Sequence, residues 1–132
     1  MKLRHLILLV CWLCNHNAVA DDQTPIRHLV IIWLKAEQPD ARSRYIEASS
    51  SLNQLPGVIR YQFGQRSNIS RSRPNSAVDD SFDLIIDAEF ESRPALEAFL
   101  KNPQYLQIAQ GQLKDLVDHY KVYDFELQAE PE

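Results

Sequence analysis

Two histidines and one tyrosine are the side chains of this sequence best suited to acid–base chemistry. His28 and His119 are the histidines that follow residue 20, and Tyr105 stands in the second half of the chain. Imidazole titrates near neutral pH, so His28 is a candidate general base, or a hydrogen-bond partner for a polar group of a ligand. The alternative interpretation is structural: a half-buried histidine bonded to the backbone or to Tyr105.

A metal site or a cofactor is not expected. His28 and His119 each stand near the start of a strand, and the two strands are expected to run antiparallel, so the imidazoles should lie about 20 Å apart. No other group of His, Cys, Asp or Glu in the sequence has the spacing of metal ligands. The sequence also lacks a glycine-rich phosphate loop, a nucleophile elbow and a zinc signature.

Three carboxylates alternate along one expected strand and could be mistaken for a catalytic acid cluster. They are Asp83, Asp87 and Glu89. Alternation places them on the polar side of the strand, away from its apolar side. We therefore expect them to form ion pairs with Arg60 or with basic residues of a partner.

The middle of the chain has the pattern of a strand followed by a helix. The alternating apolar residues of the strand are Phe82, Leu84, Ile86, Ala88 and Phe90. Ser92 can cap a helix, and Pro94 is tolerated in a first helical turn. Leu96, Phe99 and Leu100 then recur at helical spacing, so the helix should pack its apolar side onto the apolar face of the strand.

The remaining elements follow from the same two periodicities. Strands are expected over residues 27–34, 58–65 and 119–125, and helices over residues 40–55 and 104–117. Ile59, Tyr61 and Phe63 should share one strand face, and Leu106 should point inward from the last helix. Residues 66–81, rich in Ser, Arg, Asn and Pro, should form a long hairpin loop. This order predicts an α+β, ferredoxin-like split βαβ fold, with an antiparallel four-stranded sheet and its helices on one face.

The first twenty residues have the pattern of an export signal. Lys2 and Arg4 precede an apolar run over residues 6–14, and Ala18-Val19-Ala20 offers a small-residue cleavage site. The run is too short to span a bilayer comfortably. We therefore expect a signal peptide over residues 1–20, cut after Ala20, in a periplasmic or secreted protein. The mature chain would then have an N-terminal tail over 21–25, one domain over 26–125 and a C-terminal tail over 126–132.

Cleavage would leave an acidic chain without cysteine. Cys11 and Cys14 both precede the cleavage site, so the domain would have neither a disulfide nor thiol chemistry. The net charge of −4 would become −6, because two basic residues and no acidic ones are lost. An acidic exported domain is poorly suited to nucleic acid or to stable association with an anionic membrane.

The sheet is expected to be apolar on both faces. If His28, Val30 and Ile32 face the helices, their neighbours on the first strand face away from them. The apolar side chains expected on this second face are Leu29, Ile31, Trp33, Ile85, Tyr123 and Phe125. Leaving them in water would forfeit about 1.5–3 kcal/mol each relative to burial. We therefore expect a second copy of the chain to cover this face, in a homodimer.

Six short motifs along the chain carry a resemblance to a known family. They are Ile26-Arg27-His28-Leu29-Val30, Leu55-Pro56-Gly57-Val58, Phe82-Asp83-Leu84, Phe90-Glu91-Ser92, Asn102-Pro103-Gln104-Tyr105 and Val122-Tyr123-Asp124-Phe125. In this order they resemble the stress-responsive dimeric α/β-barrel (Dabb) domain family over residues 26–125. The resemblance implies a homodimer whose two sheets close a barrel, and a pocket between each sheet and its own helices.

The pocket implied by the resemblance would hold a small apolar or aromatic molecule. The residues expected to line it are His28, Val30, Ile32, Tyr45, Leu84, Ile86, Phe99, Tyr105, Ile108, Tyr120 and Val122. Tyr61 is expected to join these aromatic side chains. Aromatic residues at such spacing also pack as ordinary core, and the sequence leaves that alternative open.

A plant member of the family, olivetolic acid cyclase, closes an aldol-type ring with a catalytic tyrosine and histidine. The resemblance matches that tyrosine to Phe99, which has no hydroxyl, and that histidine to Tyr105, whose phenol is a poor base at neutral pH. Asn102 stands at the first histidine of the cyclase motif, whereas His28 matches a pocket histidine. We therefore expect this chain to share the shape of the cyclase pocket but not the proton transfer that the cyclase catalyses.

Two functions remain open at this point. The first is a non-catalytic binding protein for a small apolar or phenolic molecule, favoured because the matched positions lack an acid–base pair. The second is a cofactor-independent lyase, cyclase or oxygenase in which His28 acts with Tyr105.

Overall fold

The computed structural model describes residues 22–131, so the expected signal peptide over residues 1–20 lies outside the described residues. In this part of the chain the strands are β1 (Ile26–Leu34), β2 (Val58–Gly64), β3 (Leu84–Phe90) and β4 (Val117–Glu126). The helices are α1 (Ala41–Ser49), α2 (Arg93–Lys101) and α3 (Pro103–Ile108). A 3₁₀ segment (Ser50–Gln54) follows α1, and a π-helical turn (Ala109–Leu113) and a 3₁₀ turn (Lys114–Leu116) follow α3. Within residues 22–131, each helix is too short or too polar to cross a membrane.

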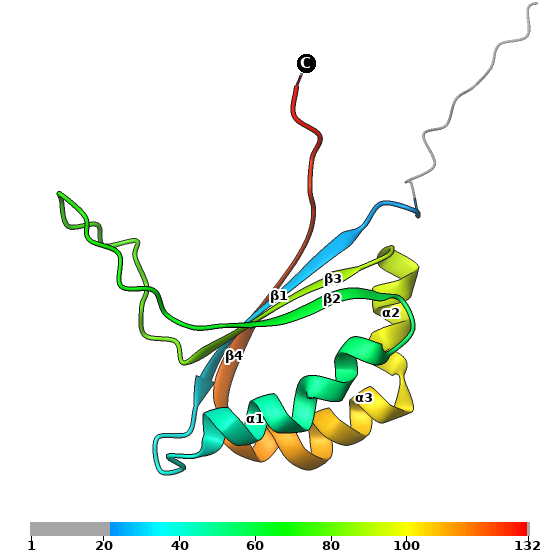
Figure 1. The fold of residues 1–132 in the computed structure, drawn as a ribbon, viewed down its shortest axis with the longest axis horizontal. Helices are drawn as coiled ribbons and strands as arrows, with labels where there is room; N and C mark the ends of the chain where they lie inside the picture. The colour runs from blue at the N-terminus through cyan, green and yellow to red at the C-terminus, as the bar shows by residue number, and fades with distance from the viewer. Residues whose placement is uncertain (1–21, 132) are drawn as a thin grey trace, which may run out of the picture.

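The four strands form one antiparallel sheet in the order β2-β3-β1-β4. The helices lie together on one side of this sheet, as Figure 1 shows. The fold is therefore α+β and ferredoxin-like, as the sequence predicts. β1 and β4 pair from Ile26 opposite Glu126 to Trp33 opposite His119, and this register decides which side chains share a face.

β3 provides the centre of the core. Its helix-facing residues Leu84, Ile86, Ala88 and Phe90 are all buried, and they alternate with partly exposed ones, as expected. α2 adds the buried side chains of Leu96 and Phe99, and the Phe99 ring lies 4.8 Å from that of Phe90. Each large apolar side chain buried here contributes about 1.5–3 kcal/mol. The strand and the helix that follows it therefore pack on one another as their periodicities predict.

Two caps and one glycine position the helices over the sheet. The Ser92 hydroxyl oxygen accepts a 3.2 Å hydrogen bond from the Ala95 amide and caps α2. The Asn102 side-chain oxygen accepts a 2.8 Å bond from the Gln104 amide and caps α3. Gly57 has φ of 83°, and a Cβ at this position would lie 2.7 Å from that of Ala95. The turn into β2 thus packs directly against the start of α2, which only glycine permits.

Two local expectations are wrong. The pairing of β2 with β3 shifts register between Val58 and Arg60, so Ile59 leaves the face of its expected neighbours and is 53% exposed. Leu106 does not point inward but is 37% exposed. The short helix α3 buries Ile108 instead, and Leu106, two positions away, lies on a different side of the helix.

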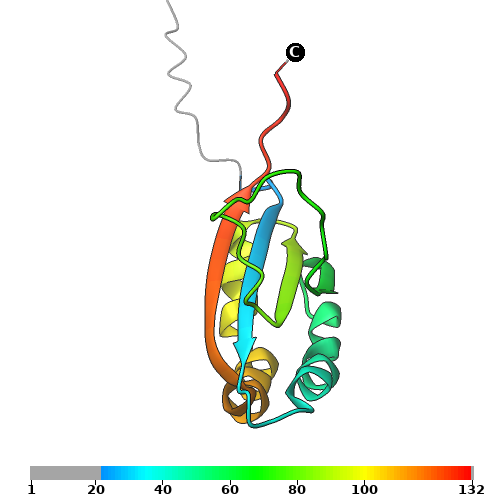
Figure 2. The ribbon, with the colours of Figure 1, turned by 90° about the vertical axis from the view of Figure 1, so that its left-hand side faces the viewer.

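The face of the sheet opposite the helices carries ion pairs among its apolar side chains; Figure 2 looks onto this face, with the helices behind. Arg27 Nη2 donates to both carboxylate oxygens of Asp87, at 2.5 and 2.6 Å. Arg60 lies 2.8 Å from Glu89, as expected, whereas the pairing of Asp87 with Arg27 was not foreseen. Asp83 accepts a bond from the last backbone amide of β1. The three carboxylates are therefore structural and do not form an acid cluster.

Trp33 anchors one end of this open face. Its ring stacks on that of His119, with centroids 4.4 Å apart, and the Lys121 ammonium lies 5.7 Å from the ring centroid. Its indole nitrogen donates to the Ser81 hydroxyl at 2.9 Å. Since Ser81 belongs to the β2–β3 loop, the base of this loop is tied to the sheet. His119 thus lies on the side away from His28, as predicted.

The connection between β2 and β3 is the long loop that the composition predicts. Residues 65–83 form neither helix nor strand and are largely exposed. Figure 1 shows this segment extending well beyond the sheet. It therefore contributes little to the core on which the candidate site is built.

Candidate functional site

A cavity of about 1020 Å³ lies between the helix-facing side of the sheet and the helices. It receives side chains from all four strands described above and from α1, α2 and α3. The expected pocket residues that line it are His28, Val30, Ile32, Tyr45, Ile86, Phe99, Tyr105, Tyr120 and Val122, and Tyr61 joins them. Leu84 and Ile108 were expected in this lining but are buried in the core, because the surrounding side chains enclose them.

The cavity opens along β4. Tyr120 is 63% exposed and Val122 is 42% exposed, yet both border the cavity. β4 is an edge strand, so no further strand within residues 22–131 covers its outer side. A molecule from solvent therefore has a route past these two side chains toward the buried wall formed by β1 and β3.

His28 and Asp124 form a cross-strand pair in the wall of this cavity. They face each other between β1 and β4, and His28 Nδ1 lies 2.5 Å from Asp124 Oδ1. His28 is 8% exposed, and its ring meets the Phe90 ring edge-on, with centroids 6.1 Å apart. Because a carboxylate can only accept, Nδ1 carries the proton, and Nε2 remains available as a base or an acceptor.

The carboxylate partner of His28 is a residue of the candidate site that the sequence did not predict. If His28 has a structural role, the sequence predicts a hydrogen bond from its ring to the backbone or to Tyr105. The imidazole instead contacts the Asp124 carboxylate. Asp124 belongs to the motif Val122-Tyr123-Asp124-Phe125. Knowledge of which residues of β1 and β4 pair would have identified it as the partner of His28. The residue pattern alone could not supply that register, because a shift by two residues preserves which side chains face the helices.

Three tyrosines of the lining keep their phenols neutral. Burial, with lesser contributions from neighbouring tyrosines, raises the pKa of Tyr45, Tyr61 and Tyr105 above its ordinary value. A hydrogen bond with Ser49 opposes this effect at Tyr61 only in part. At neutral pH these side chains therefore act as hydrogen-bond donors, and Tyr105 is even less suited to be a base than a free phenol.

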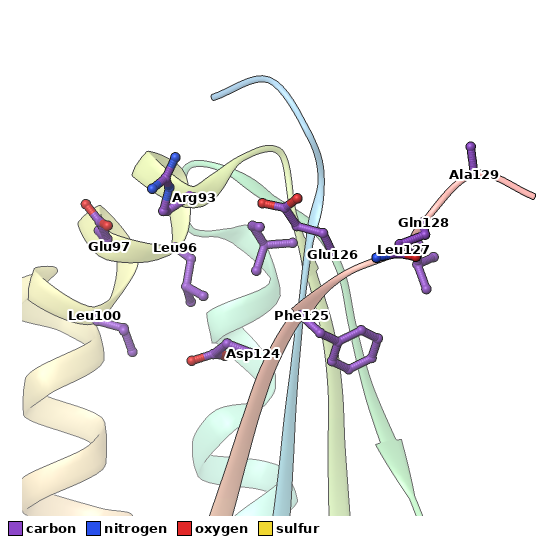
Figure 3. A pocket seen from close by; sticks show the side chains of 11 residues that line it. Arg93, Leu96, Glu97, Leu100, Asp124, Phe125, Glu126, Leu127, Gln128 and Ala129 are labelled. Atoms are coloured by element: carbon purple, nitrogen blue, oxygen red, sulfur yellow. The ribbon is translucent and has the colours of Figure 1, made fainter. Parts of the chain in front are cut away.

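A second hollow, of about 790 Å³, lies where β4 runs into the C-terminal tail. Figure 3 shows its walls: Arg93, Leu96 and Leu100 come from α2, and the facing residues come from β4 and the tail. Asp124 points toward α2 and borders both hollows, whereas Phe125 points to the opposite side of the strand. Arg93 is already paired with Asp22, at 2.8 Å. Besides the carboxylate that it shares with the larger cavity, this hollow is lined by Glu97 and Glu126, but by no histidine or tyrosine of the described residues.

The side chains expected at a dimer interface lie on the open face of the sheet. Leu29, Ile31, Trp33 and Ile85 are partly buried within the single chain. Tyr123 and Phe125, on the edge strand, are 49% and 42% exposed. The pairing of β1 with β4 places Tyr123 and Leu29 on the same face of the sheet, because the two residues stand opposite each other. Among residues 22–131, no three His, Cys, Asp or Glu side chains group as metal ligands would.

The architecture defines a class of protein: a ferredoxin-like α+β domain with a ligand-sized cavity between sheet and helices. The sequence model of the stress responsive A/B barrel domain (Dabb) matches residues 26–127. The chain therefore belongs to the stress responsive A/B barrel domain family, as its motifs predict. A comparison with curated proteins finds no match.

Solved structures share this fold at low sequence identity. A Dabb family protein from Mesorhizobium loti has a TM-score of 0.64 at 18% identity, over 81% of this chain and 100% of that one. A dimeric ferredoxin-like protein of unknown function from Thermobifida fusca has a TM-score of 0.61 at 19% identity, over 79% and 92%. A hydroxynitrile lyase from Passiflora edulis has a TM-score of 0.64 at 18% identity, over 83% and 99%. These likenesses establish the fold alone.

Proposed function

We propose that this chain is an exported, homodimeric binding protein that holds a small apolar or aromatic molecule between its sheet and its helices. The observation that carries the proposal is the cavity of about 1020 Å³, which has the size of a small-molecule site. Val30, Ile86 and Phe99 give it apolar walls, while Tyr45 and Tyr105 add neutral phenols. Such a lining suits an aromatic body with a few hydrogen-bonding groups.

The open face of the sheet supports the homodimer. Tyr123 and Phe125 expose large apolar surfaces, and Leu29 and Ile31 lie beside them. A patch of this kind on a folded chain favours a protein partner over water. A twofold axis would bring this face onto its own copy, and the Thermobifida fusca protein of the same fold is dimeric.

Export is supported by the pattern of the first twenty residues. Expression in a bacterium, followed by fractionation and intact mass measurement, tests it directly. The mass should correspond to a chain that begins at Asp21, in the periplasm or the medium. A full-length chain retained in the cytoplasm would contradict this part of the proposal.

Ligand binding can be tested with a neutral aromatic probe, naphthylethanol. The melting temperature of the protein should rise with probe concentration, because a ligand of the folded state alone stabilises it. Val122→Trp would place an indole at the mouth of the cavity and should abolish the rise. Gln107→Trp, on an exposed position of α3 outside the lining, should leave it intact. The same rise in both variants would contradict binding in this cavity.

The His28–Asp124 pair favours a second candidate, a cofactor-independent lyase, cyclase or oxygenase. Asp124 fixes the tautomer of His28 and would stabilise the imidazolium formed when Nε2 removes a proton from an enolisable or phenolic substrate. The neutral Tyr105 phenol would donate a hydrogen bond to the oxygen on which charge develops. Tyr105 thus acts as a hydrogen-bond donor in this mechanism, and His28 acts as the base.

Proton abstraction can be measured without knowing the natural substrate. Deuterium exchange at the methyl group of naphthyl methyl ketone, followed by NMR, reports on a general base in an aromatic site. His28→Gln should reduce catalysed exchange to background. His119→Gln changes an exposed histidine that stacks on Trp33 at the far end of the cavity, and this variant should retain the exchange. If the His28 variant exchanges as fast as the unaltered protein, the catalytic candidate must be dropped and the binding function stands alone.

A further inference from the structure

The cavity carries a positive charge at one end, and this end indicates the chemistry of the ligand. Resting on the proposed binding function, we propose that the molecule held in the cavity is a small aromatic acid whose anionic group lies between Lys35 and Lys114. Both lysines border the cavity beyond the end of β1. The Lys35 amide donates to the Leu116 carbonyl at 3.0 Å, which holds the end of β1 against the turn that carries Lys114.

These two ammonium groups have no acidic partner within residues 22–131. None of the ion pairs in the described chain involves Lys35 or Lys114, although acidic residues outnumber basic ones, 18 to 14. Lys35 is also partly buried. Lys114 is exposed. An anionic ligand would give both ammonium groups the charge-assisted bond that no carboxylate of the described chain supplies.

The acidic residues of the lining do not neutralise this end. Asp118 borders the cavity nearby, with its carboxylate 2.6 Å from His119 Nδ1, but it is a single carboxylate beside two ammonium groups. Asp124 is bound to His28 and stands about 20 Å from Lys35 along the extended strand. The lysines thus form a cationic end, and the His28–Asp124 pair forms a separate polar end.

The walls between the two ends are compatible with an acid. Burial raises the pKa of Tyr45 and Tyr61, so neither phenol carries a negative charge that would repel a carboxylate at neutral pH. Phe99 and Tyr105, with ring centroids 4.8 Å apart, offer an aromatic surface to the body of the ligand. An aromatic acid therefore places its apolar body and its charge against complementary parts of one cavity.

Three probes of similar shape but different charge test whether the cavity prefers an anionic ligand. Naphthylacetate, naphthylethanol and naphthylethylamine are titrated against the purified protein by calorimetry at neutral pH. The acid should bind about tenfold more tightly than the alcohol, as expected for one partly buried ion pair. The amine should bind more weakly than both, and added salt should reduce the affinity of the acid alone.

A double substitution and a control substitution test whether Lys35 and Lys114 cause the preference for the acid. Lys35→Gln combined with Lys114→Gln should abolish the preference for the acid and leave the affinity for the alcohol unchanged, which also shows that the variant is folded. Lys101→Gln, on an exposed position of α2 outside the cavity, should keep the preference. Equal binding of acid and alcohol by the unaltered protein, or a preference that survives the double substitution, would overturn the inference. If the alcohol also fails to bind, the proposed binding function falls with it, whereas alcohol binding without acid preference overturns this inference alone.

Discussion

The imidazole of His28 and the carboxylate of Asp124 meet at 2.5 Å across the β1–β4 ladder, on the side of the sheet that faces the helices. His28 is buried, whereas the Asp124 side chain is 49% exposed. The pair therefore joins a desolvated base to a carboxylate that still contacts water. This arrangement satisfies the ring nitrogen and leaves the carboxylate partly hydrated, which limits the cost of burying charge.

Removal of this carboxylate should destabilise the protein. Asp124→Ala leaves a buried ring nitrogen without a partner, so the free energy of unfolding should fall by about 1–3 kcal/mol. Asp118→Ala removes the partner of His119 on the same strand, but both of those side chains are exposed, so the loss should stay below about 0.5 kcal/mol. Urea denaturation of the two variants checks the difference. Equal losses would show that the His28 pair contributes no more than a surface contact.

Two glycines should respond to alanine in opposite directions. At Gly57 a side chain would combine a positive φ with a 2.7 Å approach to the Ala95 Cβ, so Gly57→Ala should cost about 1–2 kcal/mol from the backbone alone and more from the clash. At Gly111, apart from its own helical turn and chain neighbours, no heavy atom of the described residues lies within 4 Å of the added Cβ, and the position is helical. Gly111→Ala should stabilise by about 0.5–1 kcal/mol. Thermal unfolding of both variants tests this, and stabilisation by Gly57→Ala would contradict the close packing of that turn.

Stability should fall at alkaline pH because of the buried tyrosines. Their pKa is raised above the ordinary 10.0, so the unfolded chain loses these protons first as the pH rises. Below pH about 10 the phenols are neutral in both states and contribute no pH dependence; above it the free energy of unfolding should decrease. Replacing Tyr45 and Tyr61 by Phe should reduce that slope by about 1.4 kcal/mol per pH unit for each tyrosine. Denaturation curves at several pH values above neutrality measure it, and an unchanged slope would contradict the assignment.

A charge on the open face should dissociate the proposed dimer. Phe125→Asp places a carboxylate among the apolar side chains of the open face and should yield a monomer at micromolar concentration in sedimentation experiments. Leu106→Asp is the matched control, because Leu106 is exposed to a similar extent but lies on the helical side. It should remain a dimer. An unaltered protein that sediments as a monomer, with Trp33 fluorescing as in water, would remove the basis of this prediction.

Much of the candidate site could be expected from the sequence because periodicity reports which side chains face the helices. Val30, Ile32 and Ile86 alternate on their strands and do line the cavity. Leu84 and Ile108 obey the same periodicities but are enclosed in the core. Periodicity gives the direction of a side chain, whereas its depth depends on which neighbours cover it.

The elements and most of their faces could be predicted from the chain alone, because the strand and helix repeats and the Ser92 cap are local properties of short segments. The folded structure was needed to identify the partner of His28, the pairing of Arg27 with Asp87 and the bulge that exposes Ile59. All three depend on strand register, which is set by contacts between segments far apart along the chain. Such contacts form only when the sheet and helices pack together, so no local pattern encodes them.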